Sequence, residues 1–289
     1  MDVLLPRTLK EALEMKAAHP QTVPLAGGTD LMVDLNFGRL RPPSILDVSR
    51  LPELRVLSRE DGRCFLGAGV PYSRITAELG EFRPLAQASR SVGSPQIRNR
   101  GTVGGNLGTA SPAGDILPVL AVYQAEVDLV GPGGARALAW DRFLLGPKRT
   151  AIAPDELIAG VRWKVFRGTG SFSKIGTRNA MVIAVASLCL VLDEDARQVR
   201  AALGSCGPTI LRAPAAEDYL TAELRRAGGW EDPACRLGQP VIDAFAERVA
   251  EAARPIDDVR GTAAYRRHGL RVLARRALAW ALEDRRQGR

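Results

Sequence analysis

The sequence has little of the chemistry with which proteins hold metal ions. Only four cysteines and two histidines occur among its 289 residues, namely Cys64, Cys189, Cys206, Cys235, His19 and His268. No two cysteines have the close spacing of a zinc or iron–sulfur ligand set, so we expect buried structural thiols. With only two histidines, a histidine metal site or a Ser-His-Asp triad has almost nothing to build on. Redox chemistry would therefore need an organic cofactor, with any iron–sulfur cluster on another chain.

Long apolar runs are also missing. The longest, Ala180–Leu192, is shorter than the roughly 18 residues of a membrane helix and predicts a buried strand. Before Pro6 and Arg7 the N-terminus offers only Val3–Leu5, which is too little for a signal peptide. With 46% hydrophobic and 25% charged residues, we expect a soluble, cytoplasmic protein with two or three domains.

Basic residues outnumber acidic ones, 40 to 32. The formal net charge is +8, and the segment from Arg254 to Arg289 contributes much of it. Its arginines surround a predicted amphipathic helix with an apolar stripe at helical spacing, Leu270, Leu273, Ala277 and Ala281. No aromatic residues interleave with these charges and no zinc-finger spacing accompanies them. A solvated or subunit-facing helix surface is therefore favoured over nucleic-acid binding.

The first two of three predicted parts mix helices and strands. In residues 1–54, Thr8 and Glu11 form a capping box, and Gly38 is expected to end a second helix. The elements expected there are a helix after Thr8, strands Thr22–Leu25 and Ser44–Val48, and a helix Asp30–Phe37. In residues 55–177 we expect strands Leu54–Leu57, Cys64–Gly67 and Leu157–Val165, helices from Ser73, at Leu85–Ser91 and at Ile116–Tyr123, and a hairpin turn at Gly131–Gly134.

The third part, residues 178–289, is expected to begin with strands and to end with helices. The strands are Ile183–Leu192 and Val199–Leu203, and the helices are Pro214–Arg226, Val241–Ala253 and Thr262–Asp284. Pro214 suits the first position of a helix, where its missing N–H costs nothing.

A first glycine turn, Leu25–Asp30, lies between a predicted strand and a predicted helix. The adjacent glycines Gly27 and Gly28 allow positive φ and leave backbone N–H groups uncovered, which is how a chain forms an anion cradle. The alternative is a plain strand-to-helix turn, because Gly-Gly turns are common.

A second segment, Arg100–Pro112, holds four glycines in eight residues with Asn106 among them. Such a loop is costly in chain entropy and suits a place where backbone approaches a ligand closely. A flexible surface loop is the alternative. Asp115 follows at a predicted helix start, where it could cap the helix or accept from a ribose hydroxyl.

Neither segment matches the usual nucleotide signatures. There is no G-x-G-x-x-G after the first strand and no G-x-x-x-x-G-K-[ST], which disfavours Rossmann-type NAD binding and P-loop phosphoryl transfer. A ligand held by two separate glycine segments would be long and would carry a diphosphate. FAD fits that description.

The glycine segments together resemble the FAD-binding medium subunits of the molybdenum hydroxylases, the family of carbon monoxide dehydrogenase and xanthine dehydrogenase. Pro24–Leu31 resembles the first flavin motif of that family, and Gly101–Asn106, continued through Thr109–Pro112 and Asp115, resembles its second. Ser171–Lys174, continued to Arg178 and Ile183-Ala184, matches a third. The likeness covers essentially the whole chain.

The resemblance implies an α+β fold, with two α/β subdomains clasping FAD (1–54 and 55–177) and a C-terminal domain with a small antiparallel sheet and helices (178–289). The first motif would hold the diphosphate, Asp115 the ribose or adenine end, and Lys174 would lie near the isoalloxazine or its phosphates. The implied cofactor-binding residues are Pro24, Leu25, Ala26, Gly27, Gly28, Thr29, Asp30, Leu31, Val92, Gly101, Thr102, Val103, Gly104, Gly105, Asn106, Ser111, Asp115, Ile158 and Lys174. Some relatives carry His-Ser where this chain has Thr29-Asp30, so Asp30 is expected to cap its helix and not to contact phosphate.

The function implied is electron transfer without substrate activation. Electrons would come from [2Fe–2S] clusters on a small partner, pass through FAD and leave to NAD⁺, a quinone or another acceptor. A large molybdenum-cofactor subunit would complete the complex, as a dimer of heterotrimers. Two alternatives remain: a free-standing FAD-dependent oxidase or dehydrogenase, for which the chain offers few substrate acids or bases, and a non-catalytic scaffold without flavin.

Overall fold

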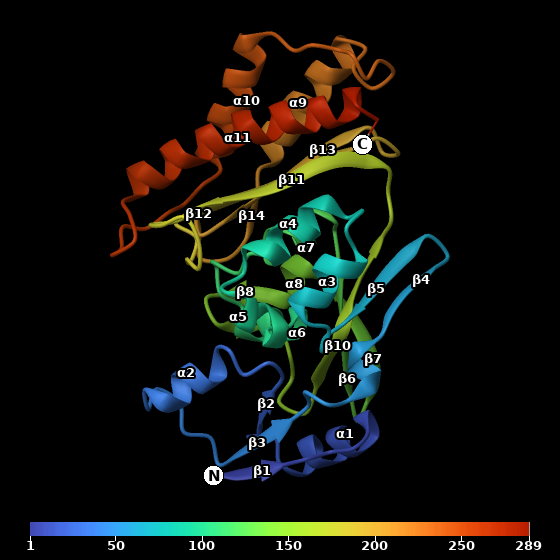
Figure 1. The fold of residues 1–289 in the computed structure, drawn as a ribbon, viewed down its shortest axis with the longest axis vertical. Coiled ribbons are helices and arrows are strands. Elements are labelled where there is room, and N and C mark those ends of the chain that lie inside the picture. Colours follow the sequence, from blue (N-terminus) through green and yellow to red (C-terminus); the bar gives the residue numbers. More distant parts are fainter. Residues whose placement is uncertain (289) are drawn as a thin grey trace. The chain divides into compact units, whose positions relative to one another are not determined.

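The computed structural model describes residues 1–288 (Figure 1). The contacts between these residues group them into two units. Unit 1 comprises residues 1–78, 93–111 and 124–165, and unit 2 comprises residues 79–92, 112–123 and 166–289. Arg289, the last arginine of the basic C-terminal segment, lies outside the described residues. The predicted domain boundaries after residues 54 and 177 stay a prediction.

Unit 1 begins with a small parallel sheet in the order β1-β3-β2, made of β1 (Asp2–Leu4), β3 (Ser44–Asp47) and β2 (Val23–Leu25). Helix α1 (Leu9–Ala18) starts as its capping box predicts, because the Thr8 hydroxyl accepts from the N–H of Glu11 at 3.1 Å. Apolar side chains of α1 and β3, Ala12 and Leu46, lie in the small core of this sheet. Helix α2 (Leu31–Asn36) is followed, as expected, by Gly38 at φ +66°.

An antiparallel sheet in the order β4-β5-β10-β6-β7 forms the larger part of unit 1. Its strands are β4 (Leu57–Glu60), β5 (Arg63–Gly67), β10 (Leu157–Lys164), β6 (Glu126–Gly131) and β7 (Gly134–Ala139). The β6–β7 hairpin confirms the predicted turn at Gly131–Gly134. The expected strand Leu54–Leu57 is wrong, because Pro52 opens a 3₁₀ helix, η1 (Pro52–Arg55), that buries Leu54.

The remaining elements of unit 1 are α3 (Tyr72–Glu78), α5 (Pro95–Arg100), α6 (Val103–Thr109), α8 (Trp140–Phe143), β8 (Leu144–Gly146) and β9 (Arg149–Thr150). Helix α6 corrects the expectation of a glycine-rich loop. The Thr102 hydroxyl caps it by accepting from the N–H of Gly105 at 3.0 Å. Gly104 packs so closely on Ala68 that a Cβ there would lie 2.6 Å from the Ala68 Cβ. Capping and close packing together outweigh the low helix propensity of glycine.

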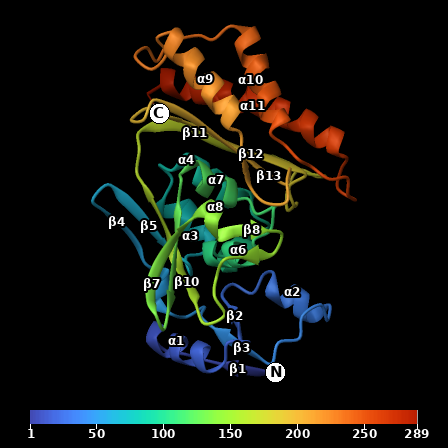
Figure 2. The ribbon, with the colours of Figure 1, turned by 180° about the vertical axis from the view of Figure 1, so that it is seen from behind.

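Unit 2 is built on an antiparallel sheet in the order β11-β12-β13-β14. The strands are β11 (Gly168–Ile175), β12 (Ala186–Asp193), β13 (Gln198–Gly204) and β14 (Leu211–Arg212). Figures 1 and 2 show helices α4 (Arg83–Ser91) and α7 (Leu117–Val122) on one face, and helices α9 (Pro214–Arg226), α10 (Gln239–Glu251) and α11 (Ala263–Arg286) on the other. Both faces of β12 are therefore covered, and all eight of its residues are buried. The whole architecture confirms the expected α+β class.

Strand β11 was not expected, and β12 begins at Ala186 and not at Ile183. The first half of β11 alternates glycine with Thr169 and Ser171, so it lacks the apolar pattern by which a strand is recognised. Its hydrogen bonds come from eight-residue pairing with β12. The register is thus set by a neighbour in the sheet and not by local side chains.

Helix α11 carries the predicted apolar stripe, and Leu270, Leu273, Ala277 and Ala281 are all buried in the core of unit 2. Several of its arginines pair with carboxylates, for example Arg271 with Glu247. All four cysteines are free and buried, as expected. Within residues 1–288, no helix is long and apolar enough to cross a membrane.

The close packing of α6 gives a stability prediction. We expect Gly104→Ala to lower the free energy of unfolding by about 1–3 kcal/mol, because its Cβ has no room against Ala68. The control is Gly133→Ala, where a Cβ would meet nothing within 4 Å. Urea unfolding of the two variants measures the difference, and equal midpoints would contradict the packing argument.

Candidate functional site

The two glycine segments of unit 1 meet backbone against backbone. A Cβ on Gly27 would lie 1.9 Å from the carbonyl oxygen of Arg100, at the end of α5. Gly28 has φ +75°, whereas Gly27 is not in the left-handed region. The expectation of positive φ therefore holds for Gly28 alone. At position 27 a glycine is required because any side chain would collide with the backbone of Arg100.

Side chains tie the first turn to α6 and to the β8–β9 connection. The carboxylate of Asp30 accepts from the Thr109 hydroxyl at 3.0 Å. Asp30 occupies the N-cap position of α2, but its side chain makes no capping hydrogen bond, so the expected cap is wrong. Lys148 contacts both α2 and the end of α6. Its ammonium lies 3.0 Å from the Asp34 carboxylate of α2, and its backbone N–H donates to the carbonyl of Ala110, the residue after α6.

The turn leaves several peptide N–H groups open. Those of Ala26, Gly27, Gly28 and Thr29 donate to no group within residues 1–288, and all four residues are half-buried. Backbone N–H groups that lack protein acceptors are partnered by water or by a ligand. Consecutive N–H groups at a turn favour an anion.

The glycines of α6 have two different roles. Gly104 serves packing against Ala68, and its N–H donates to the Ala68 carbonyl at 2.9 Å. A Cβ on Gly105 would meet only the Thr102 hydroxyl at 3.3 Å, and one on Gly108 only Ile158 at 3.8 Å. These two positions leave the helix backbone open to approach from outside.

Asn106 adds an unpaired acceptor beside this open backbone. Its Oδ1 is buried and has no hydrogen-bond partner in the protein. A buried amide oxygen without a partner costs about 1–3 kcal/mol, which a ligand donor would recover. Open N–H groups, open glycines and an orphaned acceptor thus occur together in unit 1.

The structure distributes the predicted residues over both units. Pro24 and Leu25 end β2, Ala26–Thr29 form the turn, and Leu31 begins α2. Gly101, Thr102, Val103, Gly104, Gly105 and Asn106 lead into and form α6, Ser111 follows that helix, and Ile158 lies on β10. Val92, Asp115 and Lys174 belong to unit 2. The predicted cofactor-binding residues do not include Gly108, Thr109 or Lys148, although Gly108 and Thr109 stand inside the glycine segment.

In unit 2, Lys174 and Asp115 form a buried ion pair with 11% and 7% of their side chains exposed. The Lys174 ammonium lies 2.6 Å from Asp115 Oδ2, and it also donates to the carbonyls of Ser91 and Val182. All three of its protons are therefore engaged. Asp115 precedes α7 without capping it, contrary to one expectation for this residue.

The Asp115 carboxyl is held in an unusual environment. Burial raises its pKa above the ordinary value, while the Lys174 charge and the Ser91 hydroxyl pull the pKa down. Its Oδ1 is buried and without a hydrogen-bond partner. The carboxyl can accept one further hydrogen bond.

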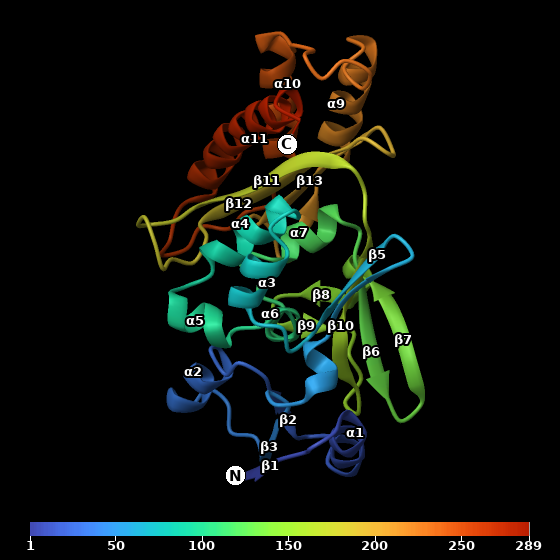
Figure 3. The ribbon, with the colours of Figure 1, turned by 45° about the vertical axis from the view of Figure 1, so that its right-hand side comes forward.

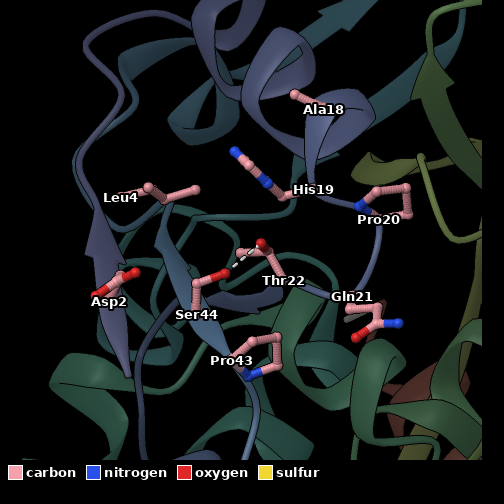
Figure 4. Close-up of a pocket in the computed structure, with 9 residues that line it drawn as sticks. All are labelled: Asp2, Leu4, Ala18, His19, Pro20, Gln21, Thr22, Pro43 and Ser44. Atoms are coloured by element: carbon pink, nitrogen blue, oxygen red, sulfur yellow. Dashed lines mark hydrogen bonds between the residues drawn. The ribbon is translucent and has the colours of Figure 1, made fainter.

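A surface depression in unit 1 lies away from the glycine turn (Figure 4). It is lined by Asp2, Leu4, Ala18, His19, Pro20, Gln21, Thr22, Pro43 and Ser44. Thr22 and Ser44, joined by a 2.5 Å hydrogen bond, lie where β2 and β3 begin, whereas the glycine turn follows the end of β2. Parallel sheets bind ligands at the carboxyl ends of their strands, so the depression is not the better candidate.

Within residues 1–288, no group of three or more His, Cys, Asp or Glu side chains could hold a metal ion. The groups that could bind a ligand at the candidate site of unit 1 are therefore backbone N–H groups, an amide and hydroxyls.

Comparisons with known proteins agree with this arrangement. The family described as the FAD binding domain in molybdopterin dehydrogenase matches residues 1–163. A xanthine dehydrogenase FAD-binding subunit of Escherichia coli O157:H7 is 27% identical over 286 residues, covering 95% of this chain and 94% of that subunit. Caffeine dehydrogenase subunit beta of Pseudomonas sp. (strain CBB1) is 32% identical over 229 residues. The match covers 76% of this chain and 77% of that subunit.

Among solved structures, carbon monoxide dehydrogenase from Hydrogenophaga pseudoflava, in a form lacking the Mo-pyranopterin moiety, contains a similar chain. The two chains share a TM-score of 0.87 and 26% identity, over 99% of this chain and 98% of that one. This chain therefore belongs to the FAD-binding medium subunits of the molybdopterin dehydrogenases, which confirms the resemblance in its sequence. It is an oxidoreductase subunit of multi-subunit complexes.

The buried pair in unit 2 gives a pH-dependent prediction. We expect Lys174→Met to lower the free energy of unfolding by about 3–5 kcal/mol at neutral pH, because it leaves the Asp115 carboxylate buried and unpaired. Since the folded-state pKa of Asp115 is already raised, the folded state prefers the protonated carboxyl. Stability is then lost as pH rises through that pKa.

The loss in Lys174→Met should consequently shrink as the pH is lowered. Urea unfolding across acidic and neutral pH measures it. The double variant Lys174→Met/Asp115→Asn is the control, and it should recover part of the stability at neutral pH. A loss that does not depend on pH would mean that the unpaired carboxylate is not its cause.

Proposed function

We propose that the cradle of unit 1 holds the diphosphate of FAD. The N–H groups of Ala26 to Thr29 would donate to phosphate oxygens, and Asn106 Oδ1 would accept from a cofactor N–H or hydroxyl. The observation that carries the proposal is the open backbone of the turn and of α6, in a chain of the FAD-binding family. The residues present fit this cofactor.

Asp30 would stay out of the phosphate contacts. Its carboxylate already accepts from Thr109, and a negative charge facing a diphosphate would be repelled. Besides donating its N–H, Gly27 would shape the turn through its contact with Arg100. The open face of α6 at Gly105 would let the cofactor approach the helix backbone, where any side chain would keep it away.

We further propose that Asp115 Oδ1 accepts a ribose or adenine-end hydrogen bond. Lys174 would then act through Asp115, because the three protons of its ammonium are engaged. A role for Val92 in lining the cofactor remains a prediction. When bound, FAD supplies both hydride and one-electron chemistry.

At the level of the complex, we propose that this chain relays electrons. They would come from [2Fe–2S] clusters on a small partner chain and leave to NAD⁺, a quinone or another acceptor. A large chain with the molybdenum cofactor would oxidise the substrate, in a dimer of heterotrimers. What supports this division is the membership of the chain among medium subunits of multi-subunit dehydrogenases.

The unpaired amide gives a direct test of the cradle. We expect Asn106→Ala to weaken FAD binding on the order of 10-fold, because one hydrogen bond to the cofactor is lost. Without FAD, the variant should unfold no more readily than the parent, since Oδ1 has no partner to lose. FAD titration by fluorescence and unfolding of the FAD-free chain separate the two effects.

The matched control is Gln198→Ala, which removes an exposed amide in unit 2, outside the three flavin motifs. It should leave FAD affinity unchanged. Unchanged FAD affinity in Asn106→Ala would remove this residue from the cofactor site.

Dependence on partners gives a second test. The chain expressed alone should bind FAD but oxidise no hydroxylase substrate, while the complex purified from its native source should contain molybdenum and iron as well as this chain. Metal analysis and activity of both preparations provide the measurement. Flavin reduction by substrate in the isolated chain would favour a free-standing dehydrogenase instead.

A further inference from the structure

Helix α2 follows directly on the N–H groups of the cradle, and a backbone hydrogen bond ties the two together. The N–H of Met32 donates to the carbonyl of Gly28 at 3.1 Å. That carbonyl and the N–H of Thr29 belong to one trans peptide unit, in which the C=O and N–H bonds point in opposite directions. The Thr29 N–H therefore points away from the first turn of α2. A shift of α2 would turn this peptide unit and change the direction of a cradle N–H group.

Apolar packing does little to fix the position of α2. None of its residues Leu31–Asn36 is buried, and Met32 and Val33 are each 42% exposed. The Phe37 ring is 73% exposed and has the Arg39 guanidinium 5.0 Å from its centre. Figures 1 and 3 show α2 set off from the three-stranded sheet on its own connections. Because so short a helix is marginal in water without packing, polar contacts must hold it in place.

Polar contacts join the α2 segment to the end of α6 and to the β8–β9 connection. The Asp30 carboxylate accepts from the Thr109 hydroxyl at 3.0 Å. The Asp34 carboxylate lies 3.0 Å from the Lys148 ammonium and 3.6 Å from the Arg39 guanidinium. Arg39 follows α2 in the chain, and its N–H donates to the Asp34 carbonyl at 2.8 Å, so it moves with the helix. Lys148 is thus the charged partner that ties α2 to the rest of unit 1.

The backbone of Lys148 is itself anchored beside α6. It stands in the turn between β8 and β9 with φ +54°, and its N–H donates to the carbonyl of Ala110 at 3.2 Å. The hydrogen bond that its ammonium donates is the largest cause that lowers the pKa of the Asp34 carboxyl. The carboxylate therefore stays charged at neutral pH, and the ion pair runs from a fixed point at the end of α6 to α2.

We propose that Lys148 is a positioning residue for the flavin: by pairing with Asp34 it fixes α2 and thereby orients the cradle N–H groups. This inference rests on the proposed function, because it assumes that the cradle holds FAD. It adds a residue outside the glycine segments that sets how fully the site is formed before the cofactor arrives. A preformed site binds more tightly, since less ordering is needed on binding.

The test titrates FAD into the full chain after its flavin has been removed. We expect Lys148→Met to raise the Kd of FAD on the order of 5-fold, the most that one exposed ion pair supports, because the competent arrangement of the cradle is then less populated. Lys148→Arg keeps a cation for Asp34 and should stay within about twofold of the parent. The matched control is Lys164→Met, which removes an exposed lysine at the end of β10 and should leave the Kd unchanged.

Asp34→Asn separates positioning from direct contact with the cofactor. If Lys148 acts through Asp34, this variant should also weaken FAD binding about 5-fold, and the double variant should bind no more weakly than either single variant. A lysine that touched the diphosphate itself would bind it no less tightly once the competing carboxylate is removed. Unchanged or tighter binding in Asp34→Asn, or multiplied effects in Lys148→Met/Asp34→Asn, would overturn the proposal.

A measurement on the unmodified chain does not depend on how any variant folds. Salt screens exposed ion pairs, so raising the KCl concentration in the flavin-free chain should speed hydrogen exchange in α2 relative to β10. Equal changes in both elements would mean that the pair does not hold α2, which also overturns the proposal. Failure of the flavin-free parent chain to bind FAD would instead contradict the proposed function, so the two failures are distinguishable.

Discussion

The contact between the Gly27 backbone and the carbonyl of Arg100 is the constraint on which unit 1 depends. It joins two segments that are about seventy residues apart, and it excludes every side chain at position 27. The Gly104 contact with Ala68 likewise brings α6 close to the segment that follows β5. The turn that contains Gly27 leaves the N–H groups of Ala26 to Thr29 without protein acceptors. A cradle for an anion is thus a result of packing.

Local signals predicted those elements whose cause is local. Thr8 caps α1, Gly38 ends α2, glycines turn the β6–β7 hairpin and Pro214 opens α9, and each effect is complete within a few residues. Helix α6 and strand β11 could not be predicted in this way. Ala68 lies 36 residues before Gly104, and β11 takes its register from β12. Their sequences, rich in glycine and serine, indicate loops until those neighbours are known.

The sequence predicts which segments could form the candidate site, but it does not predict why each residue stands where it does. Both glycine segments were selected, yet Gly27 serves contact and not positive φ. Asp30 and Asp115 were expected at helix starts, where a carboxylate is a common cap. Their partners are Thr109 and Lys174, which are distant in sequence. A carboxylate has several ways to be satisfied, and only the fold decides among them.

Helices α2 and α11 differ in how much apolar surface the chain itself buries. The apolar stripe of α11 is buried against β11 and β12, so burial stabilises that helix within the chain. Helix α2 has six residues and buries none of them. A helix of that length is marginal in water without packing. Ion pairs of Asp34 and the Phe37–Arg39 contact hold it, and each contributes on the order of 1 kcal/mol or less at an exposed site. Since Met32, Val33 and Phe37 stay exposed, burial of apolar surface contributes little to holding α2 in place.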